Sequence, residues 1–137
     1  MIQSRHFHVS ELVPPEIYQR FGERRSWNYV SPAAFAGLVA LRMYVGKPFI
    51  INNYRNGGRR EWAALRLPGS PYYSKTSQHT IANAYDILCD GLSPAELQAI
   101  VKTQYARFGI GGLEHAKTWT HIDFRKNIDG GLTEFWP

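Results

Sequence analysis

Two segments of the chain, residues 31–46 and 93–109, carry apolar side chains at the spacing of an amphipathic helix. Each segment opens with a Ser-Pro pair and closes with a glycine. Serine caps free backbone N–H groups, proline fits the first turn, and glycine tolerates the left-handed conformation that ends a helix. The pattern therefore predicts two capped helices, and a weaker pattern predicts a third over residues 15–21.

Three shorter segments lack helical spacing and are typical of β-strands. Residues 48–54 and 82–88 are short apolar runs, and residues 118–125 are rich in threonine and aromatic side chains. Residues 55–77 are rich in Gly, Pro, Ser and Arg, which predicts a long ordered loop of the kind that is usually functional. No internal repeat or Gly-rich phosphate loop is present in the sequence. We therefore predict one α+β domain over residues 1–137.

The composition disfavours several classes of protein. Of 137 residues, 44% are hydrophobic and 14% are aromatic, which is enough to bury a core and argues against wholesale disorder. No apolar run reaches the ~20 residues that span a bilayer, and residues 1–15 lack the apolar stretch of a secretion signal. The single cysteine, Cys89, allows neither an intramolecular disulfide nor a thiolate metal cluster. We expect neither a membrane protein, nor a disulfide-stapled module, nor a zinc finger.

The charge balance is basic, with 16 Lys and Arg against 11 Asp and Glu and a formal net charge of +5. Such a surface suits an anionic partner, such as nucleic acid, cell-wall polymer or lipid headgroups, and it equally serves solubility alone. The basic, Gly-rich residues 55–60 could bind phosphate or substrate carboxylates, or form a solvated turn. Four aromatic residues could line a substrate groove, although partial burial in the core is the commoner outcome. These are Trp62, Tyr72, Tyr73 and Trp119.

Two further segments carry the residue types of a metal site. His79 and Asp86 lie seven residues apart, while His121 and Asp123 lie two apart in a predicted strand, so the latter pair projects from one sheet face. Taken singly, each segment is more typical of a loop histidine or of an exposed polar strand face. Together they offer imidazole and carboxylate ligands, which zinc accepts at ~2.0–2.2 Å. Three such ligands would leave a fourth tetrahedral position open, as in catalytic zinc sites.

The order of residues in these segments resembles a known family. Residues 77–86 read S-Q-H-T-I-A-N-A-Y-D, and residues 119–123 read W-T-H-I-D. They are similar to the S-x-H-x-x-G-x-A-x-D signature and the late H-x-D of the zinc D-Ala-D-Ala carboxypeptidase family. That family includes vancomycin-resistance D,D-dipeptidases and phage L-alanyl-D-glutamate endolysins, and it shares its fold with the hedgehog signalling domain. The resemblance covers about residues 48–125, with Ala82 in place of the usual glycine.

The resemblance implies a zinc site and a fold. Carried over position by position, it assigns His79, Asp86 and His121 as ligands of Zn²⁺, with water at the open position. It also implies an arginine in the loop before the first histidine, where Arg66 would stabilise an oxyanion or hold a substrate carboxylate. The implied fold is a small antiparallel sheet that carries the metal cleft, with helices packed on its other side.

The general base departs from the family pattern. Several branches place Glu or Asp three residues before the last histidine, and this position is Thr118 here. Glu114, seven residues before His121, is the replacement that we expect, with Asp123 and His115 as alternatives. Asp123 is also expected to support His121 as a hydrogen-bond acceptor.

The sequence as a whole predicts a zinc-dependent peptidase that hydrolyses short, D-amino-acid-containing peptides of peptidoglycan. We expect a monomer that acts on stem peptides without a membrane or nucleic-acid partner. Without a secretion signal, it would stay cytoplasmic until released, as phage lysins do, or would be carried on a virion. Two alternatives remain open. One is a catalytically silent metal protein, such as a phage-particle component, and the other is a basic nucleic-acid-binding protein with salt-dependent affinity that uses Arg55, Arg59 and Arg60.

Overall fold

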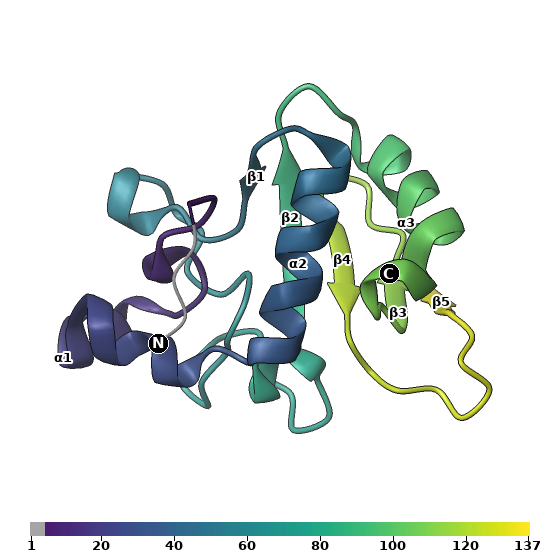
Figure 1. The fold of residues 1–137 in the computed structure, drawn as a ribbon. Coiled ribbons are helices and arrows are strands. Elements are labelled where there is room, and N and C mark those ends of the chain that lie inside the picture. Colours follow the sequence, from purple (N-terminus) through teal and green to yellow (C-terminus); the bar gives the residue numbers. More distant parts are fainter. Residues whose placement is uncertain (1–4) are drawn as a thin grey trace.

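The two Ser-Pro pairs begin helices in the computed structural model, which describes residues 5–137 (Figure 1). Helix α2 spans Pro32–Val45 and helix α3 spans Pro94–Phe108. Ser31 and Ser93 each accept a hydrogen bond from a backbone N–H of the first turn. The glycine that follows each helix adopts a positive φ, 73° after α2 and 74° after α3, as expected for a C-terminal cap. Both helix predictions are confirmed.

The amino-terminal helix is longer than predicted and kinked. Helix α1 spans Pro15–Ser26, beyond the predicted residues 15–21, and Gly22 interrupts it with φ 75° and ψ −179°. Glycine adopts this backbone conformation without a steric penalty, so the chain continues into a second helical piece. Residues 1–4 of the segment considered for a secretion signal lie outside the described residues. Among residues 5–137, no helix combines the length and the apolar character needed to cross a bilayer.

Five short strands form one sheet with the spatial order β1-β2-β4-β3-β5. Their bounds are Phe49–Ile50 for β1, Ala84–Cys89 for β2, Gly112–Glu114 for β3, Thr120–Asp123 for β4 and Thr133–Phe135 for β5. Strands β1 and β4 lie within the predicted segments, although β1 is much shorter than residues 48–54, and β2 begins inside residues 82–88 and ends one residue beyond them. Strands β3 and β5 were not predicted, because three residues give too little alternation to form a recognisable pattern.

One strand pairing corrects the expectation of an antiparallel sheet. Strand β5 pairs with β3 in parallel, whereas the other three pairings are antiparallel. After β4 the chain turns back through residues 124–132 and reaches the outer edge of β3 (Figure 1). Because the chain reverses direction after β4, β5 runs opposite to β4. Strand β3 is also antiparallel to β4, so β5 and β3 run in the same direction. The sheet is therefore mixed, while the α+β class is confirmed.

Helices α2 and α3 pack on one face of the sheet, as predicted (Figure 1). Gly37 of α2 lies so close to the end of α3 and to the residue that follows β4 that a Cβ atom would overlap the Phe108 carbonyl oxygen and the Phe124 ring. The apolar core between these layers includes Leu38, Leu41, Ile87, Leu97, Val101, Leu113 and Ile122. Because side chains alternate along a strand, the residues next to Ile87, Leu113 and Ile122 face away from the helices.

Candidate metal centre

Four strands place a row of side chains on the sheet face away from the helices. Asp86 of β2 pairs with His121 of β4, and His121 pairs with Glu114 of β3. Phe135 of β5 pairs with Glu114 and ends the row. The Cβ atoms of directly paired residues lie about 4.5–5.5 Å apart. Strand register thus makes Asp86, His121 and Glu114 neighbours, although they are far apart in the sequence.

His79 reaches this row from a short turn that precedes β2. The turn is a 3₁₀ helix, Gln78–Ile81, and the Ser77 hydroxyl caps it by accepting the backbone N–H of His79 at 3.2 Å. Ala82 ends the turn in the left-handed conformation, and the chain then enters β2. The S-x-H-x-x-A-x-A-x-D pattern therefore encodes a capped turn followed by a strand. This unit directs His79 and Asp86 toward the same point.

Ala82 has φ 56° and ψ 32°, a conformation in which its Cβ crowds the following carbonyl group. We expect Ala82→Gly to raise the free energy of unfolding by about 0.5–1 kcal/mol, because relief of this strain exceeds the extra entropy of an unfolded glycine. Urea unfolding of the metal-free protein measures the change. The control is Ala99→Gly on the exposed face of α3, which should lower stability by about 1 kcal/mol. Destabilisation by both changes would show that Ala82 is unstrained.

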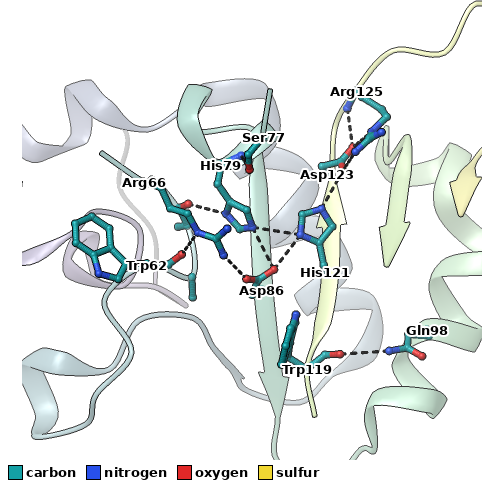
Figure 2. Close-up of polar contacts among 12 residues, drawn as sticks. Trp62, Arg66, Ser77, His79, Asp86, Gln98, Trp119, His121, Asp123 and Arg125 are labelled. Carbon is teal, nitrogen blue, oxygen red and sulfur yellow. Dashed lines mark hydrogen bonds and ion pairs between the residues drawn. The ribbon is translucent and has the colours of Figure 1, made fainter. Parts of the chain in front are cut away.

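The candidate ligand atoms of His79, Asp86 and His121 converge (Figure 2). His79 Nε2 lies 3.2 Å from Asp86 Oδ1 and 3.2 Å from His121 Nδ1, and His121 Nδ1 lies 2.9 Å from Asp86 Oδ1. All three residues are buried, with exposed fractions of 2%, 8% and 7%. A tetrahedral ion with bonds of ~2.0–2.2 Å separates its ligand atoms by roughly 3.3–3.6 Å. The distances between the three ligand atoms therefore need to lengthen only slightly for the cluster to hold a metal ion.

Hydrogen bonds on the outer side of each imidazole fix which nitrogen faces the cluster. His79 Nδ1 lies 2.7 Å from the carbonyl oxygen of Ala64, which can only accept, so Nδ1 carries the proton and Nε2 is a free ligand atom. His121 Nε2 lies 2.9 Å from Asp123 Oδ2, which leaves Nδ1 facing the cluster. Two imidazole nitrogens and a carboxylate oxygen thus point at one another. A bound cation would stabilise this arrangement, and the donor set is one that zinc accepts.

The contacts within the cluster keep its two carboxyl groups ionised. Burial opposes ionisation of Asp86, but the contacts with the imidazoles of His121 and His79 outweigh it and lower the pKa of that carboxyl well below its usual range. The pKa of Asp123 is lowered in the same way, against burial, by His121 and Arg125. Burial also opposes the charge on His121, yet contacts with Asp123 and Asp86 raise the pKa of its imidazole to about 9. Both carboxylates therefore stay ionised around the imidazole.

Asp123 is enclosed behind the cluster and does not face the pocket. Its side chain is fully buried, and its carboxylate accepts hydrogen bonds from Arg125 Nε and Nη2, both at 2.7 Å, besides the bond from His121 (Figure 2). Gly112 leaves no gap beside it, because a Cβ atom there would overlap the Asp123 carboxylate. These contacts suit a residue that orients His121, and they occupy the oxygens that a general base would need.

A pocket of about 530 Å³ opens over the cluster, and Glu114 and Arg66 line it with the three candidate ligands. Arg66 Nη2 donates to Asp86 Oδ2 at 2.9 Å, and Arg66 Nε donates to the Trp62 carbonyl oxygen at 2.8 Å (Figure 2). Burial lowers the pKa of Arg66, while the nearby charges of Asp86 and Glu114 oppose this effect. Arg66 is therefore fixed beside the cluster with Glu114 within its electrostatic reach.

Of the three general-base candidates, Glu114 is the one that lines the pocket. His115, the next residue, forms a hydrogen bond of 2.9 Å with Glu134 and stacks on the Trp136 ring at a centre-to-centre distance of 4.8 Å. Neither His115 nor Asp123 belongs to the pocket lining formed by the described residues. The geometry thus favours Glu114 over His115 and Asp123 as the candidate general base.

Three of the four aromatic residues singled out in the sequence, Trp62, Tyr72 and Trp119, line the pocket. Trp62 and Trp119 are partly buried and Tyr72 is exposed, and none of the three belongs to the apolar core of the described residues, so the expected partial burial occurs for the two tryptophans but beside the pocket and not in the core. Tyr73 is exposed and is not part of the described pocket lining. The Trp119 carbonyl oxygen accepts a hydrogen bond of 3.3 Å from Gln98 Nε2, which ties the pocket rim to α3 (Figure 2).

Arg60 has a structural role that the sequence did not indicate. It belongs to residues 55–60, which were expected to bind anions or to form a solvated turn. Arg60 instead donates from Nη2 to the backbone oxygen of Asp86 at 2.6 Å and from Nε to the backbone oxygen of Ile51 at 2.7 Å. It joins β2 to the loop beside it. An arginine among glycines carries no sequence signal for this inward orientation.

The fold and the site together define a small α+β domain with a candidate metal centre at the base of an open pocket. The peptidase M15 family model matches residues 5–123, and the chain belongs to this family. The match covers both motif segments and confirms the resemblance drawn from residues 77–86 and 119–123. Peptidases of this family are zinc-dependent. The search of curated proteins and the search of solved structures each gave no match.

Proposed function

We propose that the protein is a zinc-dependent peptidase that hydrolyses short, D-amino-acid-containing peptides of peptidoglycan. The observation that carries this proposal is the convergence of His79, Asp86 and His121 in a pocket that also holds Glu114 and Arg66. All five residues lie within the segment that matches the M15 family. The two histidines would hold zinc through Nε2 and Nδ1, respectively, and Asp86 through a carboxylate oxygen.

The residues around the cluster divide the remaining chemistry. A zinc ion held there supplies Lewis acidity, which activates water and polarises the carbonyl group of the scissile bond. Glu114 accepts the proton of the attacking water and passes it to the leaving amine. Arg66 stabilises the negative charge that develops on the carbonyl oxygen, and its hydrogen bond to Asp86 fixes its position. Asp123 keeps the imidazole of His121 in the orientation and tautomer that coordination requires.

The charge of the pocket and of the whole chain supports an anionic, peptide-containing substrate. The net charge of +5 favours association with an anionic wall polymer. The pocket is lined by arginines, carboxylates and aromatic rings, which suit the charged groups and the backbone of a stem peptide. The resemblance of residues 77–86 to D-Ala-D-Ala carboxypeptidases supports the same choice. We infer that the protein acts on the wall as a monomer, after release from the cytoplasm or from a phage particle.

Hydrolysis of a defined stem peptide tests this function. The zinc-loaded protein is incubated with a pentapeptide that contains both an L-alanyl-D-glutamate bond and a D-alanyl-D-alanine bond, and mass spectrometry identifies the products. We expect cleavage of one bond, a loss of at least ~100-fold in rate after chelation, and recovery when zinc is restored. The matched control is the all-L peptide of the same sequence, which should be cleaved much more slowly.

The other outcomes separate the alternatives. One equivalent of zinc without cleavage would indicate a catalytically silent metal protein. Equal cleavage of the all-L peptide would indicate a peptidase without preference for wall peptides. Full activity of the metal-free protein would contradict the proposed mechanism.

A further inference from the structure

The carboxyl-terminal segment beyond the family match forms one wall of the pocket. The match ends at residue 123, whereas β5 spans Thr133–Phe135. Both ends of β5 are bonded to the β3 region: the Thr133 N–H donates to the Gly111 oxygen at 2.8 Å, and the His115 N–H donates to the Phe135 oxygen at 2.9 Å. These bonds fix Phe135 beside Glu114, its direct partner in the sheet.

The ring of Phe135 contacts two side chains of the protein and also lines the pocket. Its centre lies 5.5 Å from that of the His121 ring, with an angle of 65° between the planes. The guanidinium carbon of Arg125 lies 5.2 Å from the Phe135 ring centre, and Arg125 is itself held by Asp123. Phe135 is half-buried and lines the pocket. An apolar surface therefore adjoins the candidate metal ligands.

We propose that Phe135 determines specificity by forming an apolar subsite for the side chain of a substrate residue that flanks the scissile bond. The inference rests on the proposed function, which puts the scissile bond at the cluster that includes His121. The ring centres of Phe135 and His121 are 5.5 Å apart and one extended residue spans ~3.3–3.6 Å, so we expect a residue next to the scissile bond to lie near the Phe135 ring. A polar side chain against the ring would lose water without gaining a hydrogen bond. An apolar side chain gains contact at this position.

Binding of matched peptides to metal-free protein tests the subsite independently of catalysis. The ligands are the stem pentapeptide and versions in which each alanine is replaced by glycine, and calorimetry gives the Kd of each. We expect the wild type to bind one alanine peptide about tenfold more tightly than its glycine counterpart. Phe135→Ala should reduce this ratio to within about twofold, mainly by weakening the alanine peptide, and Phe135→Leu should restore part of it.

Trp136→Ala is the matched control. Trp136 is the next residue, is 68% exposed and stacks on His115 rather than lining the pocket. This variant should keep the wild-type ratio of the two Kd values. The same comparison with zinc-loaded protein should show the same loss of discrimination in kcat/KM for Phe135→Ala.

Three results would overturn the inference. They are an equal loss of affinity for alanine and glycine peptides in Phe135→Ala, no discrimination by the wild type, and no binding of either peptide to the metal-free wild type. If thermal unfolding shows that Phe135→Ala is not folded, Phe135→Leu provides the comparison, with an intermediate ratio expected. Failure of the proposed function has a different signature: zinc-loaded wild type would cleave none of the peptides, whatever the binding ratio.

Discussion

Replacing His121 by alanine is expected to abolish both zinc binding and peptide hydrolysis. The change removes one of three candidate ligands, and it also leaves the buried carboxylates of Asp86 and Asp123 without the imidazole between them. Loss of an outer hydrogen-bond partner lowers metal affinity by about 10–100-fold, and loss of a direct ligand should cost more. Elemental analysis after dialysis against trace zinc measures the bound metal, and peptide cleavage is assayed on the same samples.

Two further variants make this result specific. His79→Ala should lose zinc in the same way, because its Nε2 atom faces the same point. His8→Ala is the matched control: His8 caps the 3₁₀ turn Val9–Glu11 and does not line the pocket, so zinc content and activity should stay at the wild-type level. Thermal unfolding of each variant checks that the fold persists. A folded His121→Ala protein with one equivalent of zinc would refute the ligand assignment.

The helices could be predicted because their limits are encoded in a few adjacent residues. A serine cap and a proline in the first turn act within one turn, and the glycine after each helix acts on its own backbone. The α3 cap shows this most fully, since Ser93 and Glu96 satisfy each other's backbone N–H groups at 3.1 Å. Such signals depend on sequence neighbours and not on the rest of the fold.

The ligand residues could be selected from the sequence, but their convergence could not. Each motif is local: one is a capped turn followed by a strand, and the other is a pair of residues on one strand face. Their meeting depends on the antiparallel register that pairs Asp86 with His121 across β2 and β4. Apolar alternation in two short strands does not specify this register. The resemblance to a family supplied what the spacing alone left open.

The pocket wall was the part of the site least accessible to sequence reasoning. Strands β3 and β5 have three residues each, and β5 joins the sheet in parallel after a long turn. Phe135 therefore gave no sign of lying near His121. The inward orientation of Arg60 was equally hidden, because burial of its guanidinium group depends on backbone oxygens in distant segments.

Glu114→Gln should lower kcat by about 10²–10⁴-fold while leaving zinc content and the fold unchanged. Glutamine has nearly the same shape as glutamate, but its amide cannot accept a proton from water. Glu114 neighbours His121 through strand pairing and is not one of the three converging ligands, so the metal should remain bound. Steady-state kinetics on the stem peptide, with elemental analysis of the same sample, measures both effects. KM should change little, because the carboxylate acts on water and not on substrate binding.

The matched control is Glu134→Gln on β5, a carboxylate that binds His115 outside the pocket and should retain kcat within about twofold of the wild type. If Glu114→Gln kept kcat within tenfold of the wild type, Glu114 would not be the general base. The contacts of Asp123 and His115 would then leave neither of them free to replace it. If zinc were lost together with activity, Glu114 would instead be a fourth ligand, and the site would be closed rather than catalytic. Because a catalytic zinc centre requires an open position, the retention of metal in this variant decides between the two roles.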